Sequence, residues 1–367
     1  MNNTITNWNG TDWRYIYVRQ LKETPLYYDT NLKIWVTYSY THCKAILEHP
    51  DARIPETPVY DLLNDKASLL TDKLTRLSNG EQHAASRAAA MAVFQKIKSV
   101  HTGKVLKYLL AAIPTGNDFD WVAVAGKQLP VRLIMQGLSF DEQDCSYAVE
   151  NLPTLVLLMK PNKTVQEIQV LNPVVDAFYN IAEKYTRRAG LLVGKKDADE
   201  TIICNLIGLI IQSYDAGRGL LCNVLLAMVT FADSKDTDWN KLIDETLRYD
   251  PPVHNTRRIA AKDIVIGGQT IKARETILVV LAAANLDDSM FANPRRFDLT
   301  RSNNDKHLTF GLGGHNCLAK YFCIDMAVEV CRFLAESYRQ IHILQKEFTY
   351  EPQLNVRLVK QLMVSLK

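Results

Sequence analysis

A long stretch with almost no charge constrains the fold of this chain most strongly. Residues 201–214 and 219–232 are two runs of 14 residues without a charged side chain, and only Asp215 and Arg218 carry charge between them. A helix that is apolar on all sides is typical of the core of a large protein, and charges at its middle disfavour a membrane span. We therefore expect a long buried helix whose polar middle has hydrogen-bond partners or a wet cavity beside it.

The apolar pattern elsewhere predicts a mainly α fold with a small β region. Helical spacing continues over about 86–111, 173–192 and 319–340. After Pro252, β-branched runs on either side of a Gly-Gly pair predict a small antiparallel sheet. We expect a single domain over 1–367, with its helical bulk at about 80–250 and 319–340 and β-rich parts near 15–40, 253–282 and 345–367.

Charge balance and cysteine content narrow the class of protein. The chain has 43 Lys and Arg against 40 Asp and Glu, a formal net charge of +3, which lacks the clustered basic charge that nucleic-acid binding needs. Seven cysteines without a C-x-x-C pair indicate neither a disulfide framework nor a zinc site. The amino terminus has no apolar run long enough for a secretory signal, so we expect a cytoplasmic protein without a membrane span.

One cysteine follows a glycine-rich loop. Residues 310–319 read Phe-Gly-Leu-Gly-Gly-His-Asn-Cys-Leu-Ala and precede a predicted helix. Glycines let the backbone approach a flat ligand closely, and a helix amino terminus favours the thiolate over the thiol. A dinucleotide-binding interpretation fails because Asn316 stands where the last glycine of that motif should be. An ordinary glycine loop with a structural cysteine is the alternative.

This loop resembles the haem-binding loop of the cytochrome P450 family, whose pattern is F-G-x-G-x-H-x-C-x-G. Ala319 replaces the last glycine at a position where small size is the requirement. The resemblance implies the cytochrome P450 fold, with haem b (iron protoporphyrin IX) as the cofactor. It implies that Cys317 is the metal ligand, an axial thiolate that favours O–O cleavage, and that Phe310, Gly311 and Ala319 bind the cofactor.

Two further segments match family motifs in the expected order. Glu245-Thr246-Leu247-Arg248 resembles the E-x-x-R motif, whose two charged residues lie one helical turn apart. Residues 293–297 resemble the segment that supplies a second arginine, which is Arg296 here. The resemblance implies that the Glu245 carboxylate, held between Arg248 and Arg296, has a structural role and locks the cysteine loop against the core. For Glu245 and Arg248 alone, the alternative is a surface ion pair.

Several cationic side chains match family positions for the haem propionates. His83 and Arg87 lie at i and i+4 on one helix face, a geometry that lets them hold one or both propionates. Arg258 and His315 match two further partners. Because Arg257 adjoins Arg258, the sequence leaves open which of the two arginines takes this role.

The central helix departs from the family pattern. The family usually carries an acid followed by threonine above the haem, and here Asp215 keeps the acid while Ala216 replaces the alcohol. The acid–alcohol proton relay is therefore incomplete. Three substitutes are open: a substrate hydroxyl with ordered water, the use of peroxide, or a hydrogen bond from Ser213 or Gln212. The remaining alternative is that Ala216 only lowers coupling.

Substrate contacts are expected from segments that line the pocket in the family. The long loop from about 54 to 77 suits a mobile lid over a moderately large, mostly apolar ligand. The region 152–170 and the final hairpin near Asn355 are further candidates. The individual residues predicted to line the pocket are Tyr214, Val253, His254, Asn255 and Thr256.

The resemblance implies a haem-thiolate monooxygenase that hydroxylates or epoxidises an organic small molecule in natural-product tailoring. It would use dioxygen and electrons from a ferredoxin or flavodoxin-type donor, and we expect a monomer. Basic side chains near the cysteine loop, among them Lys320 and Arg295, are expected to attract an acidic donor. The alternatives are a peroxide-driven or otherwise atypical haem-thiolate enzyme, and a haem-binding sensor or docking protein without turnover.

Overall fold

The structure is a computed structural model that describes residues 12–58, 60–114, 116–232 and 237–367. These residues form two compact units. The first contains the described residues up to Arg53, together with Thr102–Gly126 and Asp215–Lys367, and the second contains Ile54–His101 and Lys127–Tyr214. The expected single domain stays a prediction. The amino-terminal residues 1–11, predicted to carry no secretory signal, lie outside the described residues.

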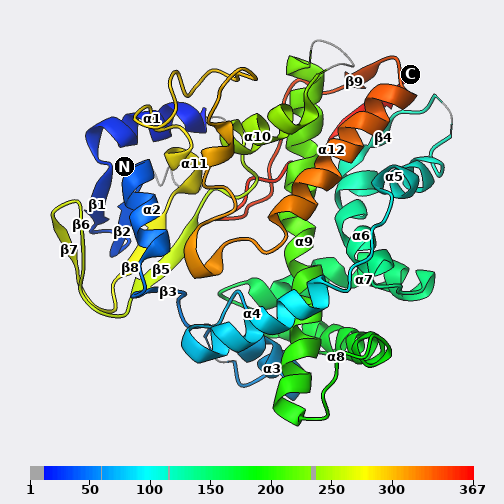
Figure 1. Cartoon of the computed structure of the whole chain (residues 1–367), viewed down its shortest axis with the longest axis horizontal. Coiled ribbons are helices and arrows are strands. Elements are labelled where there is room, and N and C mark those ends of the chain that lie inside the picture. The colour runs from blue at the N-terminus through cyan, green and yellow to red at the C-terminus, as the bar shows by residue number, and fades with distance from the viewer. Residues whose placement is uncertain (1–11, 59, 115, 233–236) are drawn as a thin grey trace. The chain divides into compact units, whose positions relative to one another are not determined.

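The first unit contains a five-stranded sheet with the strand order β1-β2-β8-β5-β3 (Figure 1). The strands are β1 (Leu26–Asp29), β2 (Ile34–Thr37), β8 (Thr276–Val279), β5 (Thr256–Ala260) and β3 (Ala52–Arg53). β2 pairs with β8 in parallel, and β5 pairs with β8 antiparallel, so that Arg258 lies opposite Ile277. Buried Trp35 and Ile277 join Ile46 in the apolar cluster beside this sheet.

Two smaller sheets complete the β region. The hairpin of β6 (Ile264–Ile266) and β7 (Gln269–Ile271) turns at Gly267 and Gly268, whose φ angles of 57° and 75° suit glycine, as the sequence predicted. The other sheet joins β4 (Phe119–Asp120), β10 (Met363–Leu366) and β9 (Ile341–Ile343).

The first unit also contains helices. They are α1 (Trp13–Glu23), α2 (Tyr40–Glu48), α5 (Thr102–Leu110), α10 (Trp239–Tyr249), α11 (Leu281–Ala284) and α12 (Lys320–Ser337), with a π-helical turn at Val122–Gly126 and 3₁₀ turns η3 (Asn304–Lys306) and η4 (Gly313–His315). α10 packs against both α12 and η3. Its N-cap is Asp238, whose side chain accepts a hydrogen bond from the Lys241 amide.

The second unit is helical. Its helices are α3 (Asp65–Lys73), α4 (Gly80–Phe94), α6 (Leu129–Gly137), α7 (Glu142–Leu155), the 3₁₀ turn η2 (Val156–Met159) and α8 (Val165–Arg188). A capping box of Thr164 and Glu167 starts α8. The predicted long helix is α9 (Lys196–Phe231), and its apolar residues are buried on successive turns, as its lack of charge requires. The division between the units falls inside α9, after Tyr214.

The mainly α fold with a small β region is confirmed, but the predicted element positions need two corrections. Residues 13–23, which overlap the part near 15–40 expected to be β-rich, form α1, because Trp13, Ile16 and Tyr17 repeat at helical spacing and Asp12 caps the first turn. The tail after residue 345 contains only the strand β10 and two isolated bridges among the described residues.

Candidate active site

The glycine-rich loop folds back on itself and presents Cys317 shortly before α12. The Cys317 amide donates to the Phe310 carbonyl at 2.8 Å, and the Gly311 amide donates to the Leu308 carbonyl at 2.8 Å. α12 begins at Lys320, three residues after the cysteine. The side chain of Cys317 is half-buried, whereas Cys331 on α12 is fully buried. Hydrogen bonds within the loop backbone therefore fix the position of Cys317, whose thiol is only partly buried.

Glycine is required inside this loop for two reasons. Gly311 and Gly313 have φ angles of 67° and 68°, in the left-handed region that side chains disfavour. A Cβ atom on Gly313 would also lie 2.5 Å from the Leu47 carbonyl oxygen of α2. Leu312 packs against the apolar cluster that contains Leu47. The loop is therefore seated directly on α2.

A buried ion pair on α10 matches the predicted E-x-x-R pair. Arg248 donates to both carboxylate oxygens of Glu245, with Nε–Oε2 at 2.7 Å and Nη2–Oε1 at 2.6 Å. Both side chains are 0% exposed, so the surface alternative does not apply. The Asp298 amide also donates to Glu245 at 2.9 Å, and Arg248 Nη1 donates to the Pro294 carbonyl at 2.8 Å. The pair thus joins α10 to the segment that follows α11.

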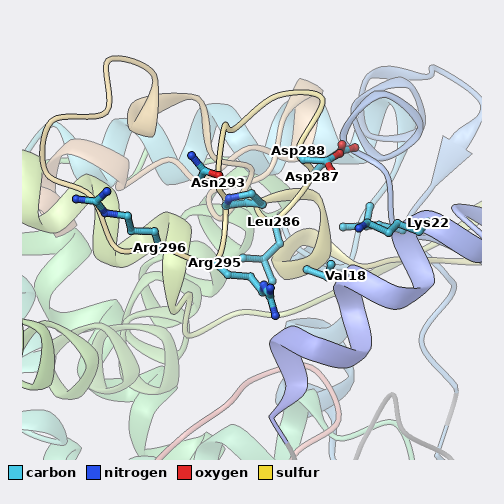
Figure 2. Close-up of a pocket in the computed structure, with 10 residues that line it drawn as sticks. Val18, Lys22, Leu286, Asp287, Asp288, Asn293, Arg295 and Arg296 are labelled. Carbon is cyan, nitrogen blue, oxygen red and sulfur yellow. The ribbon is translucent and has the colours of Figure 1, made fainter.

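The second guanidinium at Glu245 comes from Arg301, and the prediction of Arg296 is wrong. Nε of Arg301 lies 3.4 Å from Oε2 of Glu245, and its side chain is 6% exposed. Arg296 contributes only its carbonyl, which accepts from Arg248 and Arg301. The exposed Arg296 side chain instead lines an open pocket of about 670 Å³ with Lys22 (Figure 2). A turn at Asn293, which has a φ of 49°, lies earlier in the segment that carries this later arginine.

The side chains of the two candidate propionate arginines point to opposite sides of strand β5. Neighbouring residues of a strand face opposite sides, and here Arg257 is exposed whereas Arg258 is 3% exposed. Arg258 donates to the Thr256 hydroxyl at 3.0 Å and to the Arg257 carbonyl at 2.8 Å. Burial lowers the pKa of Arg258 to about 10. No carboxylate of the described residues forms an ion pair with it, so this buried cation suits an anionic ligand group.

The other predicted propionate partners are half-buried. His315 closes the 3₁₀ turn η4 inside the cysteine loop. In the second unit, His83 and Arg87 lie one turn apart on α4. Nδ1 of His83 donates to the Thr75 carbonyl at 3.0 Å, which fixes the orientation of the imidazole.

The middle of α9 remains helical through Asp215 and Ala216, both half-buried. The Ser213 hydroxyl donates to the Ile210 carbonyl at 2.8 Å, and the Gln212 amide donates to the Gly208 carbonyl at 3.0 Å. These donors are therefore engaged by their own helix, which disfavours the idea that either replaces the missing alcohol. A Cβ on Gly219 would lie 2.6 Å from that of Pro252, so α9 contacts Pro252 closely.

His254 is a core residue, and its predicted place in the substrate pocket is wrong. Its ring is fully buried, with its centroid 4.6 Å from that of Trp13, and Nδ1 lies 3.5 Å from the Tyr17 hydroxyl. Burial and the nearby cations of Arg357 and Arg14 hold the pKa of His254 well below its ordinary value. The helix α1, which the sequence pattern did not predict, supplies Trp13, Arg14 and Tyr17.

The other pocket candidates divide by burial. Asn255 is buried and donates to the Leu354 carbonyl at 2.9 Å, a link between two backbone segments. Tyr214 is 3% exposed on α9. Val253 and Thr256 are half-buried on either side of Asn255, and the Thr256 hydroxyl accepts from Arg258.

The loop predicted as a lid contains α3 and is bonded to α8. The backbone N–H of Asn64 donates to Oδ1 of Asn172 at 3.1 Å. Nδ2 of Asn172 donates in turn to the Leu62 carbonyl at 2.9 Å. Nδ2 of Asn64 also donates to Asp176 at 3.1 Å. Beside this loop lies an open pocket of about 380 Å³, lined in part by Thr71.

Two buried polar residues near the loop were missed from sequence. Asn285 is 0% exposed and Thr309 is 7% exposed, and they hydrogen-bond to each other at 2.9 Å. The sequence offered one signal, the amide residue Asn285 directly after the largely apolar run Thr276–Ala284. A polar side chain buried with such a run needs hydrogen-bond partners. Their partners lie far apart in the chain and have no sequence motif.

Within the described ranges, each helix is either too short or too polar to span a bilayer.

Comparisons with known proteins agree with this site. The cytochrome P450 family model matches residues 239–330, which include the E-x-x-R pair and the cysteine loop. The biotin biosynthesis cytochrome P450 of Bacillus subtilis (strain 168) is 37% identical over 125 residues, which cover 34% of this chain and 31% of that relative. The matched segments thus span about a third or less of the first curated relatives.

More distant likenesses extend over nearly the whole chain. Cytochrome P450 119 of Sulfolobus acidocaldarius is 27% identical, with 97% of this chain and 99% of that protein covered. The crystal structure of P450BioI in complex with an acyl carrier protein ligated to hexadec-9Z-enoic acid superposes with a TM-score of 0.83 at 21% identity, covering 96% of this chain and 98% of that one. This likeness shows the fold. The chain therefore has the cytochrome P450 fold, and its residues 239–330, which carry the site motifs, match the cytochrome P450 family.

Proposed function

We propose that this chain is a haem-thiolate monooxygenase that hydroxylates or epoxidises an organic small molecule. The observation that carries the proposal is the half-buried Cys317 on a glycine loop that is closed by the Phe310 carbonyl and seated on α2. The relative from Bacillus subtilis is named for biotin biosynthesis, which supports a biosynthetic role such as natural-product tailoring. Electrons would come from a ferredoxin or flavodoxin-type partner.

The residues of the first unit fit haem b. The Cys317 sulfur would be the metal ligand, and the buried guanidinium of Arg258 suits a propionate better than the exposed Arg257 does. His315, on the same loop as Cys317, would be a second anion partner. Bound in this way, haem supplies the chemistry of dioxygen activation. The propionate role of His83 and Arg87, which belong to the second unit, stays a prediction.

The protein would supply protons from α9. Asp215 offers a carboxyl group, and Ala216 beside it offers no hydroxyl to orient that proton. Because the Ser213 hydroxyl donates to its own helix, a water molecule or a substrate hydroxyl is the better candidate for the missing alcohol. Proton delivery would then depend on the correct substrate.

The experiment that tests the function is a search for oxidised products. Small molecules that perturb the haem spectrum are incubated with the protein, first with a reductase and ferredoxin and then with peroxide, and products are identified by mass spectrometry. Product formed only with reductase and dioxygen supports the monooxygenase. Product formed only with peroxide supports the peroxide-driven alternative, which the absence of a hydroxyl at Ala216 favours. Spectral binding without product in either assay supports a non-catalytic haem protein.

Replacing Arg258 with methionine is expected to speed haem loss about tenfold, because a charge-assisted hydrogen bond to a propionate is removed. Haem transfer to a scavenging protein measures this rate. Arg257→Met, a neighbour of the same strand with an exposed side chain, is the matched control and should lose haem at the wild-type rate. If haem is lost faster from Arg257→Met than from Arg258→Met, the propionate partner is Arg257 and the assignment to Arg258 is wrong.

Restoring the alcohol with Ala216→Thr is expected to reduce productive turnover several-fold with a substrate found in the screen. The new side chain would crowd the water or substrate hydroxyl that takes the place of the alcohol. The ratio of product formed to reductant consumed measures coupling. An increase in coupling with every substrate tried would show that Ala216 is only a weakened relay position.

A further inference from the structure

The two residues that precede the cysteine loop, Leu308 and Thr309, are held by the buried side-chain amide of Asn285. Oδ1 of Asn285 accepts from the Leu308 amide at 2.7 Å, and its Nδ2 donates to the Thr309 hydroxyl at 2.9 Å. That hydroxyl donates in turn to the Leu247 carbonyl at 2.7 Å. The Thr309 amide donates to Nδ1 of His307 at 3.2 Å. Both the backbone and the side chain of this short segment are therefore fixed.

The same amide residue is joined to the buried ion pair. The Asn285 carbonyl accepts from Nη1 of Arg248 at 3.0 Å, and Arg248 is held by Glu245. Asn285, Arg248 and Glu245 are each 0% exposed. A continuous set of buried hydrogen bonds thus runs from α10 through Asn285 to Thr309.

This set ends one peptide bond from the cysteine loop. Phe310 follows Thr309 directly, and its carbonyl accepts the Cys317 amide at 2.8 Å. A shift of Thr309 would therefore move the acceptor that holds the Cys317 backbone. We propose that Asn285 and Thr309 are positioning residues that set the place of Cys317, although neither touches the sulfur in the described contacts.

The residue types fit this role. An asparagine side chain offers an acceptor and two donors at once, and a threonine hydroxyl can accept one hydrogen bond while it donates another. Apolar residues of the same shape at both positions would fill the space without fixing the direction of the chain. Buried polar groups carry a desolvation cost, and they specify one arrangement when every partner is satisfied.

Thr309→Val tests the proposal, because valine keeps the shape of threonine and removes its hydroxyl. Nδ2 of Asn285 and the Leu247 carbonyl then lose their short hydrogen bonds to that hydroxyl and keep only the longer one to each other, at 3.4 Å. Thr309→Ser keeps the hydroxyl and is the conservative variant. Thr186→Val is the control for burial, because Thr186 is 1% exposed and its hydroxyl bonds only within α8. Each full-length protein is examined as purified, by amide hydrogen exchange at Cys317 and by the absorption of its reduced carbon monoxide complex.

In Thr309→Val we expect exchange at the Cys317 amide to become about tenfold faster, since the loss of the two short buried hydrogen bonds to the hydroxyl loosens the segment. Part of the red-shifted Soret band of thiolate ligation should be lost as well. Thr309→Ser and Thr186→Val should match the wild type in both. Wild-type exchange and an unchanged band in a less stable Thr309→Val protein would overturn the proposal.

A substitute variant and a measurement that does not depend on haem keep this test decisive. If Thr309→Val does not accumulate, Thr309→Ala removes the same hydroxyl with a smaller side chain, and the same outcomes apply. The spectral measurement rests on the proposed haem-thiolate function, whereas the exchange measurement does not. A wild-type protein without the thiolate band would therefore contradict the function, while the exchange rates would still decide the role of Thr309.

Discussion

Replacing Glu245 with alanine is expected to lower the free energy of unfolding by about 3 to 5 kcal/mol and to yield little haem-loaded protein. The change leaves Arg248, which is 0% exposed, without its carboxylate, and removes the partner of Arg301. Because a domain is stable by only about 5 to 15 kcal/mol, this loss is a large share of the total. Denaturant unfolding and haem content of the purified variant measure both effects.

A surface pair of the same spacing provides the control. Glu329 and Arg332 on α12 also form an i,i+3 ion pair, but their side chains are 45% and 49% exposed. Glu329→Ala should therefore change the free energy of unfolding by less than about 1 kcal/mol. Equal effects of Glu245→Ala and Glu329→Ala would show that the buried pair does not support the fold.

Replacing Cys317 with alanine or histidine is expected to abolish the red-shifted Soret band of the reduced carbon monoxide complex. No other described cysteine follows a glycine loop, and burial raises the pKa of Cys331 to about 12, so that thiol is a poor source of thiolate. Dioxygen-dependent product should disappear with the band.

Cys331→Ala is the matched control, since it removes a thiol from the helix that follows the loop. It should keep both the band and the product. Retention of the band in Cys317→Ala would mean that another residue ligates the iron.

Local patterns explain what the sequence could predict. The cysteine loop, the pair of Glu245 and Arg248 and the buried helix α9 all depend on neighbours within one or two helical turns or one loop. The residues of each feature lie close together because of their spacing in the sequence. Strand alternation at β5 places Arg257 and Arg258 on opposite sides, and the structure shows that Arg258 is the buried one.

Contacts between distant segments explain the rest. Arg301 reaches Glu245 from a segment that is distant in the sequence, and His254 is covered by α1, which lies more than two hundred residues earlier. Asn285 finds its partners on α10 and on the segment before the loop. Such partners depend on the packed arrangement, so a single sequence contains no local signal for them.

The resonance Raman spectrum of the ferric protein tests the central claim most directly. Two samples are prepared, one with unlabelled cysteine and one in which the cysteine sulfur is replaced by a heavier isotope. Ligation by Cys317 predicts an iron–sulfur stretching band that moves to lower frequency on labelling and is absent from Cys317→Ala. A haem-loaded wild-type protein with no isotope-sensitive band would contradict the assignment of Cys317 as the thiolate ligand.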